Sequence, residues 1–171
     1  MIQLDQTTQQ LKDNAEIIRT LVQSVPQKQA DWKPDEETWS IKEVMDHLYN
    51  EERLDFRKHL QEMLSDPPRP WGKFNPDDWV RLESFTQALE GFLSERGSSL
   101  DWLGSLEAPD WEVTSQISFG PSREILVLSA GDVLVSWVAH DFLHIRQLNE
   151  LLFAWHEVQS SPYSVRYAGD W

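Results

Sequence analysis

The chain of 171 residues contains no cysteine. It therefore has no disulfide, no thiolate metal ligand and no cysteine nucleophile. It also lacks any apolar run of about eighteen residues, so we expect no transmembrane helix. Its first residues lack a basic segment followed by an apolar one, so we expect no signal peptide and a cytoplasmic location.

Basic residues are scarce. The sequence has 15 Lys and Arg against 29 Asp and Glu, which gives a formal net charge of −14. Proteins that bind nucleic acids need basic surface to neutralise phosphates, and anionic membrane surfaces attract basic segments. We therefore expect neither a nucleic acid nor a membrane as a partner, and we interpret the charge as favouring solubility.

Apolar residues are present in the proportion that a globular protein needs. They make up 40% of the chain, and nine of them are tryptophans, which usually lie in a core or line a pocket. The length suits one domain with a full core. No linker or internal repeat is visible, so we predict a single domain over residues 1–171.

Helical periodicity dominates the chain. Apolar residues recur at helical spacing in four long segments: 4–25, 40–64, 78–103 and 129–158. The connections between them are moderate to long, and the last one, of about 26 residues, can cross a bundle. The sequence therefore predicts an all-α fold, a four-helix bundle with long crossover connections.

Two of the expected helices have clear N-terminal signals. Ser40 is followed by Glu43 in a capping box, and Ser129 is followed three residues later by Asp132. Before the last helix, residues 111–119 alternate in part between apolar and polar. Gly120-Pro121 is typical of a turn, and residues 125–128 are apolar, so we predict a small β-hairpin there.

Two histidines stand on the apolar stripe of the last predicted helix. His140 and His144 are four residues apart, so they lie one turn apart on the same face. The stripe also contains Val133, Trp137, Leu148, Leu151 and Trp155. Two imidazoles so placed can bind one metal ion. Two separately hydrogen-bonded histidines remain the alternative.

A third ligand would have to come from elsewhere in the chain, because a catalytic site of the zinc type takes three protein ligands. His156 is three turns beyond His144, too far to share the ion. His47 and His59 lie three turns apart in the second helix, so only one of them can take part. Helical geometry leaves both open, because His59 falls on the apolar side of that helix and His47 on its flank.

Both histidine-bearing segments resemble the motifs of a known family. The segments are Trp39-Ser40-Ile41-Lys42-Glu43-Val44-Met45-Asp46-His47-Leu48 and Ala139-His140-Asp141-Phe142-Leu143-His144-Ile145-Arg146-Gln147-Leu148. They resemble the two motifs of the DinB-like family, the superfamily of DinB/YfiT-like metalloenzymes. The resemblance covers nearly the whole chain. It implies a four-helix bundle with long crossovers and a metal bound by His47, His140 and His144, and so favours His47 over His59.

The resemblance also implies a reaction. Characterised relatives include transferases that use low-molecular-weight thiols, so our leading hypothesis is a metal-dependent, thiol-dependent S-transferase activity on a small molecule. The ion would be zinc, nickel, iron, cobalt or manganese. Because the chain has no cysteine, the thiol would be a cosubstrate. Arg146, or else Arg53 or Arg57, is the candidate for pairing with its carboxylates.

Two other functions stay open. The first is metal-dependent hydrolysis, in which Glu51, one turn after His47, acts as general base or orients a ligand. The second is a non-catalytic metal-binding or stress-response interaction protein. A homodimer is the expected oligomer, because symmetric dimers are the commonest soluble assemblies.

Overall fold

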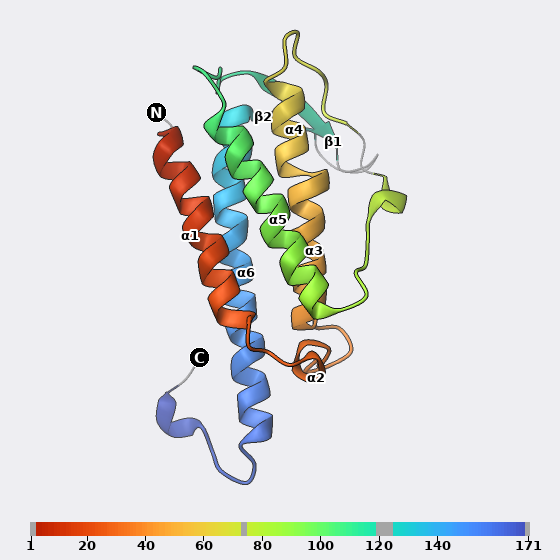
Figure 1. Ribbon diagram of the computed structural model, residues 1–171, viewed down its shortest axis with the longest axis vertical. Coiled ribbons are helices and arrows are strands. Elements are labelled where there is room, and N and C mark those ends of the chain that lie inside the picture. The colour runs from red at the N-terminus through yellow and green to blue at the C-terminus, as the bar shows by residue number, and fades with distance from the viewer. Residues whose placement is uncertain (1–2, 73–74, 119–124, 170–171) are drawn as a thin grey trace.

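The computed structural model describes residues 3–72, 75–118 and 125–169. It confirms the all-α four-helix bundle (Figure 1). The bundle consists of α1 (Leu4–Val22), α3 (Ile41–Leu54) continued by α4 (Phe56–Met63), α5 (Phe85–Gly104) and α6 (Ala130–Gln159). Among the described residues, three short helices lie in the connections and the tail: α2 (Gln27–Ala30), η1 (Pro76–Asp78) and η2 (Arg166–Ala168).

The order of the helices around the bundle differs from their order in the chain. Helix α1 packs against α5 and α6, and α3 packs against α5, so α1 and α3 lie diagonally across the bundle. The connection from α4 to α5 runs back along the length of the bundle, which makes α3 and α5 parallel (Figure 1). In the described part of the chain, no helix is both long enough and apolar enough to cross a membrane.

The second predicted helix is interrupted. Asp55 has φ −117° and ψ −91°, which is outside the helical region, and it separates α3 from α4. The axis nevertheless continues, because the Asp55 amide still donates to the Glu51 carbonyl and the His59 amide to the Asp55 carbonyl. One predicted helix is therefore two, with an irregular residue between them.

The third predicted helix starts later than the sequence suggests. Residues before Phe85 are held against α3 by side chains. The Asn50 amide exchanges two hydrogen bonds with the Val80 backbone, and Asp46 accepts one from the Leu82 amide. Because these backbone groups are already satisfied, they have less need of a helical ladder. Helix α5 begins instead at the capping box of Ser84.

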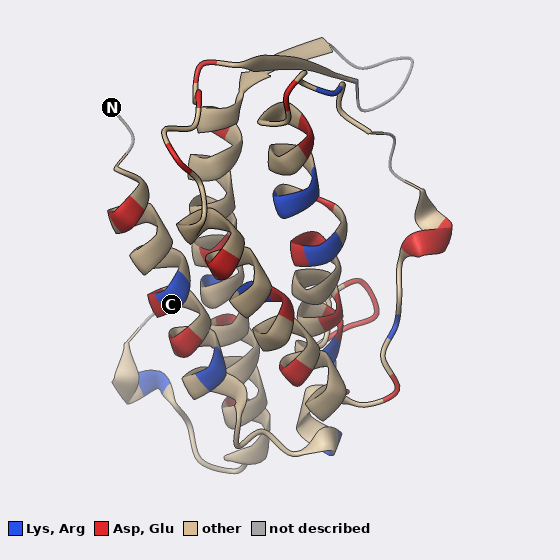
Figure 2. Cartoon of the chain, turned by 45° about the horizontal axis from the view of Figure 1, so that its top comes forward, with Lys and Arg blue, Asp and Glu red and all other residues tan. Residues whose placement is uncertain are grey.

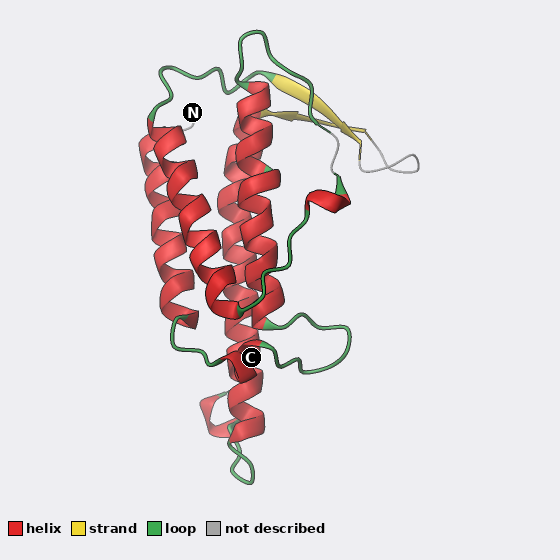
Figure 3. Ribbon diagram, turned by 45° about the vertical axis from the view of Figure 1, so that its right-hand side comes forward, coloured by secondary structure: helices red, strands yellow, loops and turns green. Residues whose placement is uncertain are grey.

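The predicted hairpin is present. Strand β1 (Thr114–Ser118) pairs antiparallel with β2 (Ile125–Ser129), with Thr114 opposite Ser129. The hairpin lies at one end of the bundle (Figure 3). The turn expected at Gly120-Pro121 lies outside the described residues. Ser129 both ends β2 and caps α6, and the predicted caps at Ser129 and Ser40 are confirmed as capping boxes.

Buried polar residues divide the core into two apolar clusters. One cluster contains Ala15, Ile18, Val22, Ala30, Ile41, Val44, Met45, Leu48, Phe85, Ala88, Leu89, Phe92, Leu148 and Leu151. The other contains Leu11, Leu60, Met63, Leu103, Ala130, Val133, Leu134 and Trp137. Asn14, Glu52, Arg96, Ser99 and Asp141 are buried at chain positions between the two clusters.

Acidic and basic side chains occur on all four long helices, and acidic ones are the more numerous (Figure 2).

Candidate metal centre

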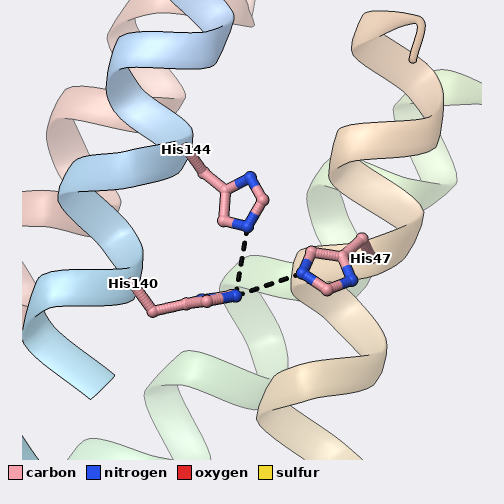
Figure 4. Close-up of side chains that lie close together, drawn as sticks. All are labelled: His47, His140 and His144. Carbon is pink, nitrogen blue, oxygen red and sulfur yellow. Dashed lines mark hydrogen bonds between the residues drawn. The ribbon is translucent and has the colours of Figure 1, made fainter. Parts of the chain in front are cut away.

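Three histidines from two helices converge at the level of this polar layer. Helix α3 carries His47, and α6 carries His140 and His144 (Figure 4). The Nε2 atom of His140 lies 3.1 Å from Nε2 of His47 and 3.1 Å from Nε2 of His144. Among the residues that the structure describes, this is the one cluster of His, Cys, Asp or Glu suited to hold a metal ion. His59 is not part of this cluster, and its Nδ1 atom is hydrogen-bonded to Asp55.

Hydrogen bonds among the three rings cannot satisfy all three of their Nε2 atoms. His144 Nδ1 lies 2.8 Å from Gln147 Oε1, an acceptor, so Nδ1 carries the hydrogen and Nε2 of the neutral ring keeps its lone pair. His140 Nε2 has at most one hydrogen and two nitrogens at 3.1 Å. It cannot donate to both His47 and His144. A cation that accepts all three lone pairs fits the arrangement.

The spacing fits a transition-metal ion. Two nitrogens that each lie about 2.1 Å from one ion are about 3.0 Å apart at an angle of about 90°, and about 3.4 Å apart at the tetrahedral angle. The 3.1 Å separations from His140 Nε2 to its two neighbours fall in that interval. The donor set is three imidazoles without a thiolate, which suits zinc, nickel, cobalt or iron(II).

Burial keeps the imidazoles uncharged. It lowers the pKa of His47 to about 3, with the neighbouring histidines contributing, and the pKa of His140 to about 4. Burial also lowers the pKa of His144, against the hydrogen bond to Gln147. Neutral rings keep the lone pairs that a metal needs, so the site is in its ligating form at neutral pH.

A carboxyl pair adjoins the centre. Glu51 Oε1 lies 3.7 Å from His47 Nδ1, the ring nitrogen that faces away from the other two histidines. Burial and the neighbouring Asp55 raise the pKa of Glu51 to about 8. Asp55 is the ionised partner, because hydrogen bonds from His59 and Glu51 outweigh burial and lower its pKa. The two carboxyls thus hold one proton beside the metal ligands.

His59 is the last of four polar residues that are spaced four apart along α3 and α4. Its Nδ1 lies 2.5 Å from Asp55 Oδ1, and its ring stacks on Trp71 with the centroids 3.8 Å apart. His59 is only 5% exposed, as its place on the apolar side of the helix suggested. His47, Glu51, Asp55 and His59 follow one another at intervals of four. That spacing was visible in the sequence, but it did not reveal the role of Asp55.

Aromatic rings surround the histidines. The ring centroid of Trp39 lies 5.1 Å from that of His47, and the Trp39 ring is parallel to that of His144 at 6.5 Å. Trp79 lies 5.7 Å from His47, and Phe56 lies 5.2 Å from His140. Trp39 is 41% exposed, so this side of the site reaches the surface. These contacts could not be predicted from the sequence, because Trp39 lies in a connection without periodicity and Trp79 lies in the connection before α5 rather than in the predicted helix 78–103.

The candidate arginines have partners within the protein. Arg53 donates to the Asp78 carbonyl at 2.7 Å, and Arg57 is paired with Glu95. Arg146 is exposed on α6, where its Nε lies 3.4 Å from the Glu150 carboxylate. None of these contacts ties an arginine to the three histidines. The expected role of Arg146 in binding a cosubstrate stays a prediction.

The sequence also matches a known family. Residues 10–148 match the DinB superfamily. The chain belongs to that superfamily. A comparison with curated protein sequences finds no significant match. Among solved structures, this DinB protein is similar to YfiT from Bacillus subtilis, described as a probable metal-dependent hydrolase with an unusual four-helix bundle topology. The TM-score is 0.66 at 18% identity, over 87% of this chain and 85% of YfiT, which shows that the two share a fold.

Proposed function

We propose that this protein is a metal-dependent hydrolase that acts on a small molecule. The observation that carries the proposal is the Glu51 carboxyl, which shares a proton with Asp55 and lies 3.7 Å from the ligand His47. A carboxyl whose pKa is near neutrality can both accept and return a proton at the working pH. The description of YfiT as a probable metal-dependent hydrolase agrees with this proposal.

Each residue has a role in such a reaction. His47, His140 and His144 would hold a divalent ion such as zinc, leaving positions for substrate and water. The ion would act as a Lewis acid toward a carbonyl or phosphoryl oxygen and lower the pKa of water. Glu51 accepts the proton of the attacking water and returns it to the leaving group. Asp55, bonded to both Glu51 and His59, orients the Glu51 carboxyl.

Thiol transfer, our leading hypothesis from the resemblance, has less support near the centre. It needs a group that anchors the carboxylates of an anionic thiol. Arg53 and Arg57 already bind protein oxygens, and Arg146 pairs with Glu150 on the exposed side of α6. The Glu51–Asp55 pair instead supplies what hydrolysis requires. We therefore place hydrolysis first.

A substrate screen decides between the two reactions. Metal-loaded protein is assayed on small esters, amides and phosphoesters with and without added thiols. We expect thiol-independent cleavage that Glu51→Gln lowers by about 10²–10⁴-fold. Glu90→Gln, the same change at an exposed position of α5, should have no effect. Turnover only with a thiol, or full activity of Glu51→Gln, contradicts the proposal.

A further inference from the structure

A fully buried arginine lies behind the metal centre. Arg96 of α5 is 1% exposed. Its Nε donates to Glu52 Oε1 at 2.7 Å, and its two Nη atoms donate to the two oxygens of Asp141 at 2.8 Å each. Nη1 also donates to the Leu11 carbonyl at 2.8 Å. The guanidinium thus joins all four long helices, and the pairing with Asp141 is bidentate, which fixes direction as well as distance.

The other atoms of this cluster are satisfied as well. Trp137 Nε1 and Ser99 Oγ each donate to a different oxygen of Glu52 at 2.8 Å, and Asn14 Nδ2 donates to Asp141 at 3.2 Å. Although burial alone would lower it, the two carboxylates raise the pKa of Arg96. Arg96 therefore stays charged, and both of its carboxylate partners are hydrogen-bonded in the core.

On two helices, a residue of the Arg96 cluster is the sequence neighbour of a residue at the metal centre. Glu52 follows Glu51 on α3, and Asp141 follows His140 on α6. Consecutive residues of a helix point about 100° apart. On each helix one residue of the pair therefore faces the centre and the next one faces Arg96. The same guanidinium contacts the inner sides of the two helices that supply all three histidines.

This arrangement is not explained by stability alone. A buried ion cluster often contributes no more stability than apolar residues of the same size, because desolvation offsets the attraction between the charges. Such clusters can instead select one register of packed elements. Register matters here, because His47 and His140 are on different helices and their Nε2 atoms must meet at 3.1 Å.

We propose that Arg96 is the positioning residue of the metal centre. By holding Glu52 and Asp141 at once, it sets the rotation and register of α3 relative to α6, and so the distance from His47 to His140. The inference rests on the metal site of the proposed function, although not on hydrolysis itself. Arg96 forms no hydrogen bond with any of the three histidines among the described residues. Its charge also acts on His140 through space, but it can set the positions of the three rings only through the helices.

A charge-neutral variant separates positioning from stability. The triple variant Arg96→Met, Glu52→Gln, Asp141→Asn removes all three buried charges. Each new amide keeps one oxygen, which can accept from Trp137 and from Asn14 respectively, and the Ser99 hydroxyl can accept from the new Gln NH2 group. Its folding is followed by circular dichroism and urea unfolding without metal, and its metal site by titration with Co²⁺ and the visible absorption of bound Co²⁺. We expect cooperative unfolding, at least tenfold weaker Co²⁺ binding and a changed spectrum.

Two further variants make the result specific. Lys42→Met removes a partly buried ion pair with Asp46 on the helix that carries His47, and it should leave Co²⁺ affinity unchanged. Should the triple variant fail to fold, Arg96→Lys serves instead, because it keeps the charge and loses the planar fork. Arg96→Lys is expected to weaken Co²⁺ binding and alter the spectrum in the same way.

The possible outcomes are distinct. Unchanged affinity and spectrum in a folded Arg96 variant contradict the positioning role and leave the proposed function intact. Wild-type protein that binds no Co²⁺ overturns both, because no metal centre then exists. Wild-type protein that binds Co²⁺ and hydrolyses nothing contradicts the hydrolase alone, and the Arg96 variants still test the positioning role.

Discussion

The Nε2 atoms of His47 and His140 lie 3.1 Å apart, although 93 positions separate the two residues in the chain. Neither helix can form the three-histidine site alone. The pair on α6 offers two ligands, and the third arrives only when α3 is packed in register. The site is therefore a property of the folded bundle rather than of a local motif.

Metal content is the first prediction. We expect about one divalent ion per chain in protein purified without chelators, because three neutral imidazoles point their nitrogens at one place. His144→Ala should lose the ion, and His156→Ala on the exposed end of the same helix should keep it. Inductively coupled plasma mass spectrometry measures both. Retention of the ion by His144→Ala would mean that it binds elsewhere.

Proton release on metal binding is the second prediction. The imidazoles are already neutral at pH 7, so they release almost nothing. Glu51, with its pKa raised to about 8, is mostly protonated at pH 7 in the metal-free protein. A cation nearby favours the ionised carboxyl, so this proton should leave on binding.

Isothermal titration calorimetry in buffers of different ionisation enthalpy measures that release. Glu51→Gln should release fewer protons than wild type at pH 7, by most of one proton per ion bound, whatever bound water contributes in both. Glu90→Gln should match wild type. Equal release by wild type and Glu51→Gln would show that the protonation of Glu51 does not change when the metal binds.

Acid sensitivity of the metal-free protein is the third prediction. Since folding lowers the pKa values of His47 and His140 to about 3 and about 4, the unfolded chain binds more protons below about pH 6.5. The free energy of unfolding should therefore fall as the pH drops from about 6.5 toward 4. Glu51 acts oppositely: its contribution is present below about pH 4.5 and is lost as the pH rises through about 8.

Urea unfolding at several pH values, in the presence of a chelator, tests these signs. The double variant His47→Gln, His140→Gln should lose much of the decline toward acid pH. The pH dependence that remains in its free energy of unfolding should then show more of the contribution from Glu51, which has the opposite sign. A double variant with the same pH dependence as wild type would mean that these two imidazoles are protonated equally easily in both states.

The stability of Arg96 variants is the fourth prediction. Arg96→Met alone leaves Glu52 and Asp141 as buried carboxylates without a counter-charge, so we expect a loss of about 3–5 kcal/mol in the free energy of unfolding. The neutral triple variant should recover most of it. Lys42→Met should cost less than Arg96→Met, because it leaves one carboxylate unpaired instead of two and Asp46 keeps its hydrogen bond from the Leu82 amide. Urea denaturation at pH 7 measures all three, and a single variant as stable as wild type would contradict the account.

Much of the fold could be predicted from periodicity and caps. The four helices, the hairpin and the starts at Ser40 and Ser129 follow from apolar spacing and from side chains that bind their own backbone. The break at Asp55 and the late start of α5 could not. The late start depends on side chains of α3, such as Asn50, that bind backbone far away in the sequence.

The candidate site was predictable in part. The spacing of His140 and His144 indicated a shared face, but helical phase did not distinguish His47 from His59, and only the family resemblance did. The structure places His47 beside the pair. The partners Asp55, Trp79 and Arg96 escaped sequence analysis, because their importance depends on which helices become neighbours.

The diagonal placement of α1 and α3 bears on how the chain folds. The first helix packs against the last, and the parallel pair of α3 and α5 requires a connection that runs the length of the bundle. Many native contacts therefore join residues far apart in sequence, and loop-closure entropy must be overcome before those contacts form. This bundle should fold more slowly than an up-and-down bundle of equal length, in which each helix packs on the one just made.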